Sequence, residues 1–219
     1  KPVQTLLYGE SSLPQLYQRI SQRAAEGHQA FIVFPLREES ELMDLQSANE
    51  QYELLSAGIF CNNRIGLITG KMSWSEKEAV MKRFLQKEIE ILCATTVIEV
   101  GVDVPNATFM VIIDAQRFGL AQLHQLRGRI GRGDKQSYCI LVTKDSIAEQ
   151  AQKMLAEKTG NKIRLHNENE ETLTAAKRLH IMVQHTNGFI VAEMDMQLRG
   201  PGEFYGRKQS GIPALKYAN

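Results

Sequence analysis

Short apolar runs recur along the chain, and helix-forming segments separate most of them. The runs have the length of β-strands and cover residues 30–34, 64–68, 89–93, 109–113 and 138–142. In the intervening segments apolar residues recur at helical spacing, as Leu16, Ile20 and Ala24 do ahead of Gly27. Because a strand that is covered on both faces has no polar side, this alternation is typical of a parallel sheet. The sequence therefore predicts an α/β fold, a parallel sheet with helices on both faces.

Two threonines directly follow one of these runs. Right-handed crossovers place the carboxyl ends of parallel strands at one edge of the sheet, where ligands bind in such folds. Thr95 and Thr96 come after the run 89–93, so we expect them at this edge. Their hydroxyl and N–H groups suit the phosphate oxygens of a nucleic-acid backbone. The alternative is that both residues cap the short helical turn expected at residues 97–100.

Residues 125–132 are rich in phosphate-binding side chains. They read Gln-Leu-Arg-Gly-Arg-Ile-Gly-Arg, and the glycines allow tight backbone turns. Arginine is permanently charged and can bind phosphate oxygens through two parallel hydrogen bonds. We therefore expect Gln125, Arg129 and Arg132 to bind a triphosphate or its transition state, the alternative being a solvated basic patch. Arg127 would lie on another face of a helix than Arg129, which indicates a structural or DNA-facing role.

Composition limits the classes of protein to which the chain can belong. The net charge of +1 neither favours nor excludes nucleic acid, so a DNA-binding surface would have to be formed locally. No apolar run approaches the roughly 20 residues that span a bilayer, and no signal-peptide pattern opens the chain. Cys61, Cys93 and Cys139 have no disulfide or metal spacing, which indicates reduced thiols in a cytoplasmic protein. His124 has no second ligand at a suitable spacing, so we expect a hydrogen-bonded helix histidine and no metal site.

A phosphate-binding loop of the GxxxxGK[ST] type is missing from the sequence. The pair Gly70-Lys71 resembles one, but Ile65 stands where the first glycine is required. The chain also begins at Lys1 without a methionine. We therefore expect a piece of a longer protein that supplies side chains to a nucleotide bound by another domain, and that has negligible ATPase activity alone.

After residue 145 the pattern becomes helical. Ile147, Ala151 and Met154 form one apolar stripe, and Leu173, Ala176, Leu179 and Met182 form a second after the polar residues 166–171. Two such helices would pack as a hairpin. Glycines 200, 202, 206 and 211 then indicate a loop. We divide the chain into a domain at 1–145 and a helical hairpin with a hook-shaped loop at 146–219.

These motifs resemble those of a known family. Residues 125–132 look like motif VI of the superfamily 2 helicases, and residues 95–107, TTVIEVGVDVPNA, look like their motif V. Residues 118–133 and the later stretch 198–211, LRGPGEFYGRKQSG, resemble the RecG-type DNA helicases within that superfamily. The resemblance implies that Arg129 and Arg132, with Gln125, contact the γ-phosphate of ATP across a domain cleft. It also implies nucleotide-binding roles for Gly101 and Asp103.

The resemblance further implies an activity and partners. The full-length enzyme would use ATP and Mg²⁺, bound mainly by an upstream motor domain, to translocate on double-stranded DNA. It would remodel stalled forks and branched recombination intermediates, acting as a monomer beside an upstream wedge domain. Arg178, Arg199 and Gln209 match the positions that couple the hairpin to the loop. Two alternatives remain open: the related transcription-repair coupling translocase, and a binding module without motor activity.

Overall fold

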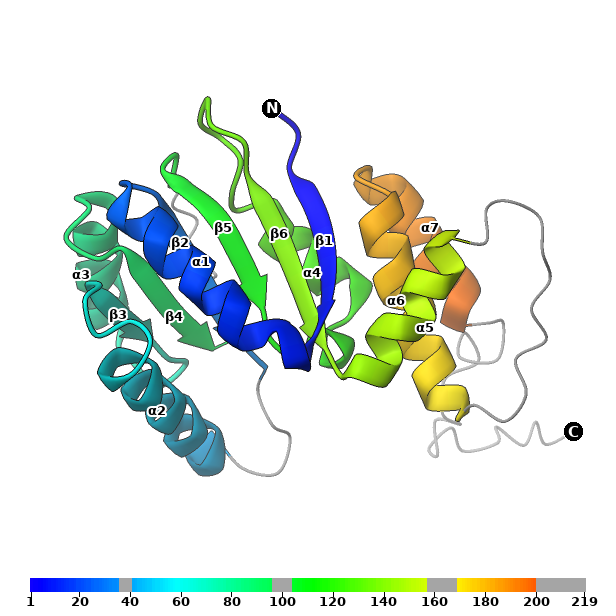
Figure 1. The fold of residues 1–219 in the computed structure, drawn as a ribbon, viewed down its shortest axis with the longest axis horizontal. Coiled ribbons are helices and arrows are strands. Elements are labelled where there is room, and N and C mark those ends of the chain that lie inside the picture. The colour runs from blue at the N-terminus through cyan, green and yellow to red at the C-terminus, as the bar shows by residue number, and fades with distance from the viewer. Residues whose placement is uncertain (36–40, 96–103, 157–168, 200–219) are drawn as a thin grey trace, which may run out of the picture.

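The computed structural model describes residues 1–35, 41–95, 104–156 and 169–199, and Figure 1 shows their arrangement. A single sheet of parallel strands has the order β1-β6-β5-β2-β4-β3. The strands are β1 Gln4–Gly9, β2 Gln29–Phe34, β3 Ile65–Ile68, β4 Ile91–Thr95, β5 Ala107–Ile112 and β6 Tyr138–Thr143. The helices are α1 Leu13–Ala25, α2 Glu41–Ala57, α3 Trp74–Leu85, α4 Leu120–Arg127, α5 Asp145–Ala156, α6 Glu170–Gln184 and α7 Gly188–Arg199. The predicted parallel α/β fold is confirmed.

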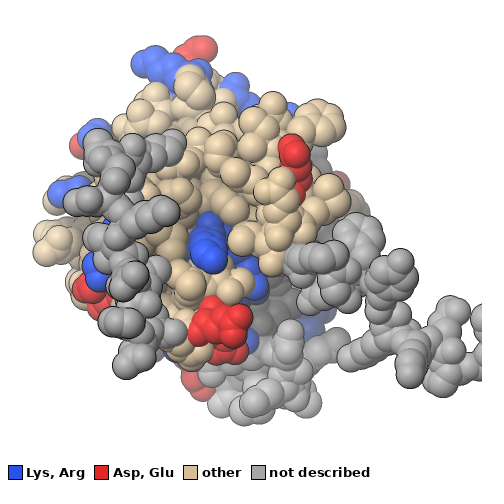
Figure 2. Space-filling model, turned by 90° about the vertical axis from the view of Figure 1, so that its right-hand side faces the viewer, with Lys and Arg blue, Asp and Glu red and all other residues tan. Residues whose placement is uncertain are grey.

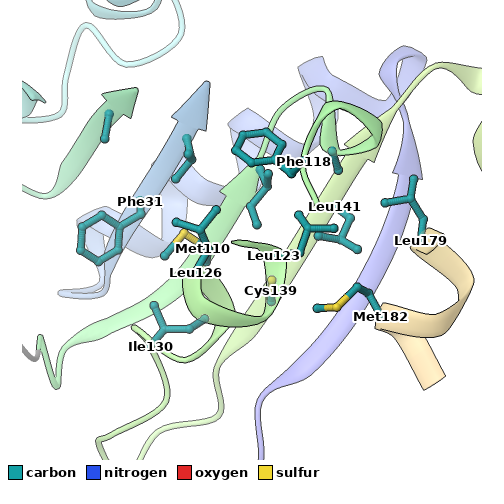
Figure 3. Packing of buried hydrophobic residues seen from close by; sticks show 14 of the residues in the cluster. Phe31, Met110, Phe118, Leu123, Leu126, Ile130, Cys139, Leu141, Leu179 and Met182 are labelled. Carbon is teal, nitrogen blue, oxygen red and sulfur yellow. The ribbon is translucent and has the colours of Figure 1, made fainter. Parts of the chain in front are cut away.

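Helices cover both faces of the sheet because the central strands are apolar on both sides. On one face, α3, α4, α5 and α6 enclose a core that contains Phe31, Met110 and Leu141, drawn in Figure 3. On the other face, α1 and α2 pack on alternate residues of the same strands, such as Ile32 and Val111. Every residue of β2 and β4 is buried, as the apolar runs predict.

Strand β1 was not among the predicted strands. It lies at the edge of the sheet beside β6, and Gln4, Thr5, Leu6 and Tyr8 keep part of their surface exposed. A half-polar edge strand lacks the continuous apolar run that revealed the others.

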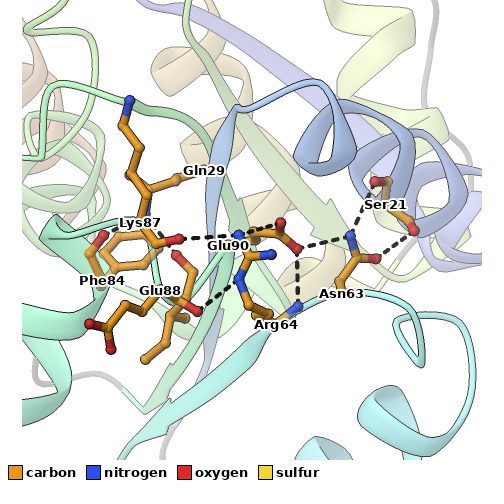
Figure 4. A network of polar contacts seen from close by, with 9 residues as sticks. Ser21, Gln29, Asn63, Arg64, Phe84, Lys87, Glu88 and Glu90 are labelled. Carbon is orange, nitrogen blue, oxygen red and sulfur yellow. Dashed lines mark hydrogen bonds and ion pairs between the residues drawn. The ribbon is translucent and has the colours of Figure 1, made fainter.

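A polar network fixes the amino ends of the strands, as Figure 4 shows. Arg64, just before β3, forms an ion pair of 2.7 Å with Glu90 and donates to the carbonyl of Lys87. Asn63 donates to Glu90 and accepts a hydrogen bond from Ser21 of α1. These contacts bind α1, β3 and the turn before β4 together at one edge of the sheet.

The C-terminal part is helical, as predicted, with one more helix than expected. The apolar stripes of α5 and α6 face the core, with Ile147, Ala151, Leu179 and Met182 buried. Helix α7 follows α6 after a short connection, and its Val191 joins the same core. Residues 200–219, for which a hook loop was predicted, lie outside the described part of the chain.

Candidate functional site

Thr95 lies at the carboxyl edge of the sheet, as predicted. It ends β4, its side chain is 2% exposed, and its Oγ1 accepts a hydrogen bond of 3.2 Å from the N–H of Gly70. The hydroxyl therefore holds the loop between β3 and α3 against the end of β4. Thr96, Gly101 and Asp103 lie outside the described residues, so their roles stay predictions.

Helix α4 presents Gln125 to solvent. Leu120, Leu123 and Leu126 are buried against the sheet, which leaves the opposite side of this short helix exposed. At its start, the N–H of Gly119 donates to the side-chain oxygen of Gln122 over 3.1 Å. The spacing of these leucines thus determines which side of α4 faces outward, and Gln125 lies on that outward side.

The two arginines that follow α4 lie near the surface. Arg129 is partly exposed and Arg132 is exposed, so neither is enclosed in the core. Between them, Gly131 has a φ of 84°, a conformation that side chains with a Cβ rarely adopt. Ile130 is buried and holds this segment to the domain. Two cationic side chains are therefore displayed on a segment whose backbone is fixed.

Residues 129–133, which we call the arginine segment, do not lie at the same edge of the sheet as Thr95. Gly131 packs against the side chain of Val3, and Gly133 lies against the carbonyl of Pro105. Both neighbours precede strands, β1 and β5 respectively, so the segment lies beside the amino ends of the strands. The arginines therefore do not lie at the edge where Thr95 and Thr96 were expected. The contact with Pro105 does bring the end of the segment resembling motif V to the end of the segment resembling motif VI.

Arg127 has the most extensive contacts of this region. The residue is 4% exposed, and its guanidinium donates to the carbonyls of Met182, His185 and Thr186 over 3.0, 2.9 and 3.1 Å. These oxygens belong to the end of α6 and the connection to α7, where helix carbonyls have no partner within the helix. The structural role predicted for Arg127 is confirmed, and it joins the motif VI helix to the helical hairpin.

His124 completes this junction. Its Nδ1 lies 2.9 Å from Nη2 of Arg127, and because arginine only donates, Nδ1 accepts and the proton resides on Nε2. Burial lowers the pKa of His124, and the positive charge of Arg127 lowers it further. Its ring packs against Gly188, where an added Cβ would lie 2.6 Å from Nε2. The predicted hydrogen-bonded histidine is confirmed, and it contacts the first residue of α7.

The residues predicted to couple the hairpin to the loop are only partly described. Arg178 lies on α6 and is partly exposed. Arg199 ends α7, and its side chain lies outside the description, as does all of Gln209. The described part of the chain does not test whether these three residues meet, and their coupling role stays a prediction.

Sequence reasoning did not identify the partners of Arg127. His124 and Arg127 are three residues apart, so they share a helix face, and this spacing was the available signal. The carbonyls to which Arg127 donates come from residues 55 to 59 positions later in the chain. No local pattern indicates such a contact.

Among the described residues, no broad basic region is seen on the side where α5, α6 and α7 lie. In Figure 2, the Lys and Arg side chains of this side are scattered among uncharged atoms and interspersed with Asp and Glu. Among the residues described, no group of three or more His, Cys, Asp or Glu could hold a metal ion, and no helix is long and apolar enough to cross a membrane.

Comparison with known proteins gives the family. The sequence model of the helicase conserved C-terminal domain matches residues 11–134. The chain belongs to this helicase family. The matched residues run from the turn before α1 to the end of the arginine segment, so they include Thr95, Gln125, Arg129 and Arg132.

Within the helicase family, the chain is similar to RecG over its whole length. It is 46% identical over 219 residues to the ATP-dependent DNA helicase RecG of Synechocystis sp. and 45% identical to that of Aquifex aeolicus. The chain spans 23% and 25% of the length of these relatives. A structure of RecG bound to a three-way DNA junction matches 93% of the chain, and 23% of its own, with a TM-score of 0.69 and 41% identity.

A more distant structure is similar in fold alone. The second helicase domain of the DEAD-box protein Mss116p, bound to an RNA duplex, has a TM-score of 0.54 at 16% identity. That match covers 90% of this chain and 86% of the other. The helicase C-terminal domain fold is therefore shared well beyond the RecG relatives.

Proposed function

We propose that this chain is the second motor domain, with its attached helical hairpin, of a RecG-type ATP-dependent translocase on double-stranded DNA. The full-length enzyme remodels stalled replication forks and branched recombination intermediates. The observation that carries the proposal is the 41% identity, over 93% of the chain, to RecG bound to a three-way DNA junction. The absence of a phosphate-binding loop from these 219 residues fits a domain that completes a nucleotide site held elsewhere.

The side chains of the arginine segment act on a nucleotide that the first motor domain binds together with Mg²⁺. Arg129 and Arg132 neutralise the charge that develops on the γ-phosphate during transfer, and Gln125 positions the reacting groups. Their surface position after α4 supports this role, since a side chain that must cross a cleft has to be accessible. Gly101 and Asp103 bind the nucleotide from the same domain, and Thr96 contacts the DNA backbone. Thr95, predicted for the same contact, is buried and hydrogen-bonded to Gly70, so it positions the end of β4 instead.

Residues 1–145 form the motor domain and residues 146–219 carry its movement to the DNA. The hydrogen bonds of Arg127 support a connection between the two parts, because Arg127 lies two residues from Arg129 and donates to the carbonyls at the end of α6. A shift of the arginine segment on ATP binding would therefore reach α6 and α7 directly. Arg178, Arg199 and Gln209 continue the connection towards the loop. The enzyme works as a monomer in the cytoplasm.

The test uses the full-length protein and two DNA substrates. ATP hydrolysis is measured with a three-way junction and with a linear duplex of the same length, and strand exchange in the junction is followed by gel electrophoresis. We expect stimulation by both DNAs and ATP-dependent branch movement of the junction. Hydrolysis without any branch movement would contradict the remodelling function, and the absence of DNA-stimulated hydrolysis would contradict the motor itself.

A further inference from the structure

The sheet has one region that no described helix covers. On the face that α1 and α2 occupy, α1 crosses the middle of the sheet, and Ile140 and Val142 of β6 are buried in the same cluster as its apolar side. Strand β1 and the amino end of β6 lie beside α1, as Figure 1 shows. On the opposite face the same two strands pack against α5 and α6. A parallel sheet normally has helices on both faces. Among the described residues, no helix covers this part of the sheet.

The open region forms a groove, which we call the α1–β1 groove. It has a volume of about 530 Å³ and lies between α1 and the strands β5, β6 and β1. Leu6 and Tyr8 of β1 line it, with Tyr138 of β6 and Phe109 of β5, and all four are partly exposed. The rings of Phe109 and Tyr138 stack with their centroids 5.7 Å apart. The floor is thus formed by aliphatic and aromatic side chains of the sheet.

The width of the open strip fits one helix. Neighbouring strands lie about 4.8 Å apart, so β1 and the amino end of β6 together are about 10 Å wide. An α-helix with its side chains has a diameter of about 10–12 Å. A helix laid beside α1 would complete the second layer of the sheet, with its apolar stripe on Leu6, Tyr8 and Tyr138.

The border of the groove on α1 is basic. Arg19 and Arg23 are four residues apart, so they lie on the same side of α1, and both line the groove with exposed side chains. Glu26 is the acidic residue of the lining, and it forms an ion pair of 2.8 Å with Arg23. No ion pair of Arg19 occurs in the described part of the chain. A helix beside this border would be stabilised by acidic residues along its flank.

We propose that the α1–β1 groove holds an amphipathic helix with an acidic flank, contributed by a part of the same polypeptide outside residues 1–219. The curated relatives are about four times as long as this chain, so such a segment has room in the full-length protein. The helix lies alongside α1, with apolar side chains on the sheet and carboxylates opposite Arg19. It fastens the rest of the protein to the face of the motor domain that the arginine segment does not use.

Photo-crosslinking of the full-length protein tests this. Tyr138 is replaced by p-benzoylphenylalanine, and crosslinked peptides are identified by mass spectrometry after irradiation of a mixture of ¹⁴N- and ¹⁵N-labelled protein. We expect crosslinks from Tyr138 to one helical segment outside residues 1–219, within single molecules. The same probe at Leu54 of α2, which is 68% exposed, serves as the control and should not capture that segment. Arg19→Glu should lower the yield several-fold, and Arg19→Lys should preserve it.

Three outcomes would overturn the proposal. Crosslinks between labelled and unlabelled molecules would indicate a second copy, and crosslinks that form only to added single-stranded DNA would indicate a nucleic-acid site. Crosslinks confined to residues 1–219 would mean that nothing else occupies the groove. If the Tyr138 variant does not fold, the probe at Tyr8 tests the same surface. The inference rests on the proposed function, because the helix comes from the rest of a RecG-type polypeptide. Branch movement of DNA is not a readout here, so failure of the inference is distinguishable from failure of the proposed function.

Discussion

The guanidinium of Arg127 donates a hydrogen bond of 2.9 Å to the backbone carbonyl of His185, across 58 residues of sequence. The same side chain serves the carbonyls of Met182 and Thr186. The motif VI helix and the end of the second hairpin helix are therefore joined through one buried cation. This contact connects the helical hairpin to the helix that directly precedes the arginine segment.

Replacing Arg127 should destabilise the protein. Arg127→Ala leaves three carbonyls of the α6–α7 connection without their donor, and we expect a loss of about 2–4 kcal/mol in the free energy of unfolding. Arg127→Lys keeps the charge but provides one nitrogen instead of a planar fork, so the loss should be intermediate. Urea unfolding measures both. Lys82→Ala, at an exposed lysine of α3, is the control and should change stability by less than about 0.5 kcal/mol.

An alanine at Gly188 should disturb the same junction. The added Cβ would lie 2.6 Å from Nε2 of His124, so the imidazole must move away from Arg127. We expect a loss of about 1–3 kcal/mol in spite of the better helix propensity of alanine. Gly70→Ala is the matched control, because a Cβ there meets nothing within 4 Å. Equal stability of the two variants in urea unfolding would mean that His124 does not pack as described.

The stability of the protein should fall as the pH drops below about 6.5. The pKa of His124 is lowered in the folded state by burial and by Arg127, and that of His28 is lowered by burial and by Lys135 and Arg23. Below the ordinary histidine pKa of about 6.5 the unfolded chain therefore binds more protons, which favours unfolding. Above that pH both states are neutral at these residues and the contribution to stability is complete.

The variant His124→Gln isolates this effect. Glutamine can accept the hydrogen bond from Arg127 without titrating, so the loss of stability between pH 7 and pH 5.5 should be smaller than in the unsubstituted protein. Urea unfolding at the two pH values gives the comparison. An unchanged pH dependence would show that His124 is not a source of it.

The fold was predictable from the sequence because a parallel strand that is buried on both faces consists of consecutive apolar residues. The runs in β2 and β4 are apolar throughout and have no exposed member. Strand β1 escaped detection because an edge strand needs only some apolar residues, here with Leu7 buried and Gln4 exposed. Helix α7 escaped because its single fully buried apolar residue, Val191, makes a weak stripe.

The candidate site was predictable only where it depends on residues that are close together in the sequence. Their spacing on a helix predicted different roles for Arg127 and Arg129, although the helix in fact ends at Arg127. The partners of Arg127 depend on how α6 packs against α4, and residue spacing carries no information about that. The position of the arginine segment at the amino ends of the strands depends on its contacts with Val3 and Pro105, which are also distant in sequence.

The predicted coupling residues should separate hydrolysis from movement. In the full-length protein, Arg199→Ala or Gln209→Ala should leave ATP hydrolysis near normal and strongly reduce branch movement of a three-way junction. The reason is that these positions are proposed to transmit the motion rather than to contact the nucleotide. Arg64→Ala is the control and should alter neither activity. Arg64 directly precedes β3, the outermost strand on the side of the sheet away from β1. Full branch movement in both variants would contradict the coupling role.

The most direct test of the account concerns Arg129. In the full-length protein with junction DNA, Arg129→Ala should lower the rate of ATP hydrolysis by on the order of 10³-fold or more while leaving the affinity for ATP within a few-fold, because the arginine acts in the transition state. Hydrolysis is measured by phosphate release, and affinity by titration with a fluorescent ATP analogue. Unchanged hydrolysis would contradict the claim that this domain supplies cations to a nucleotide bound by its neighbour.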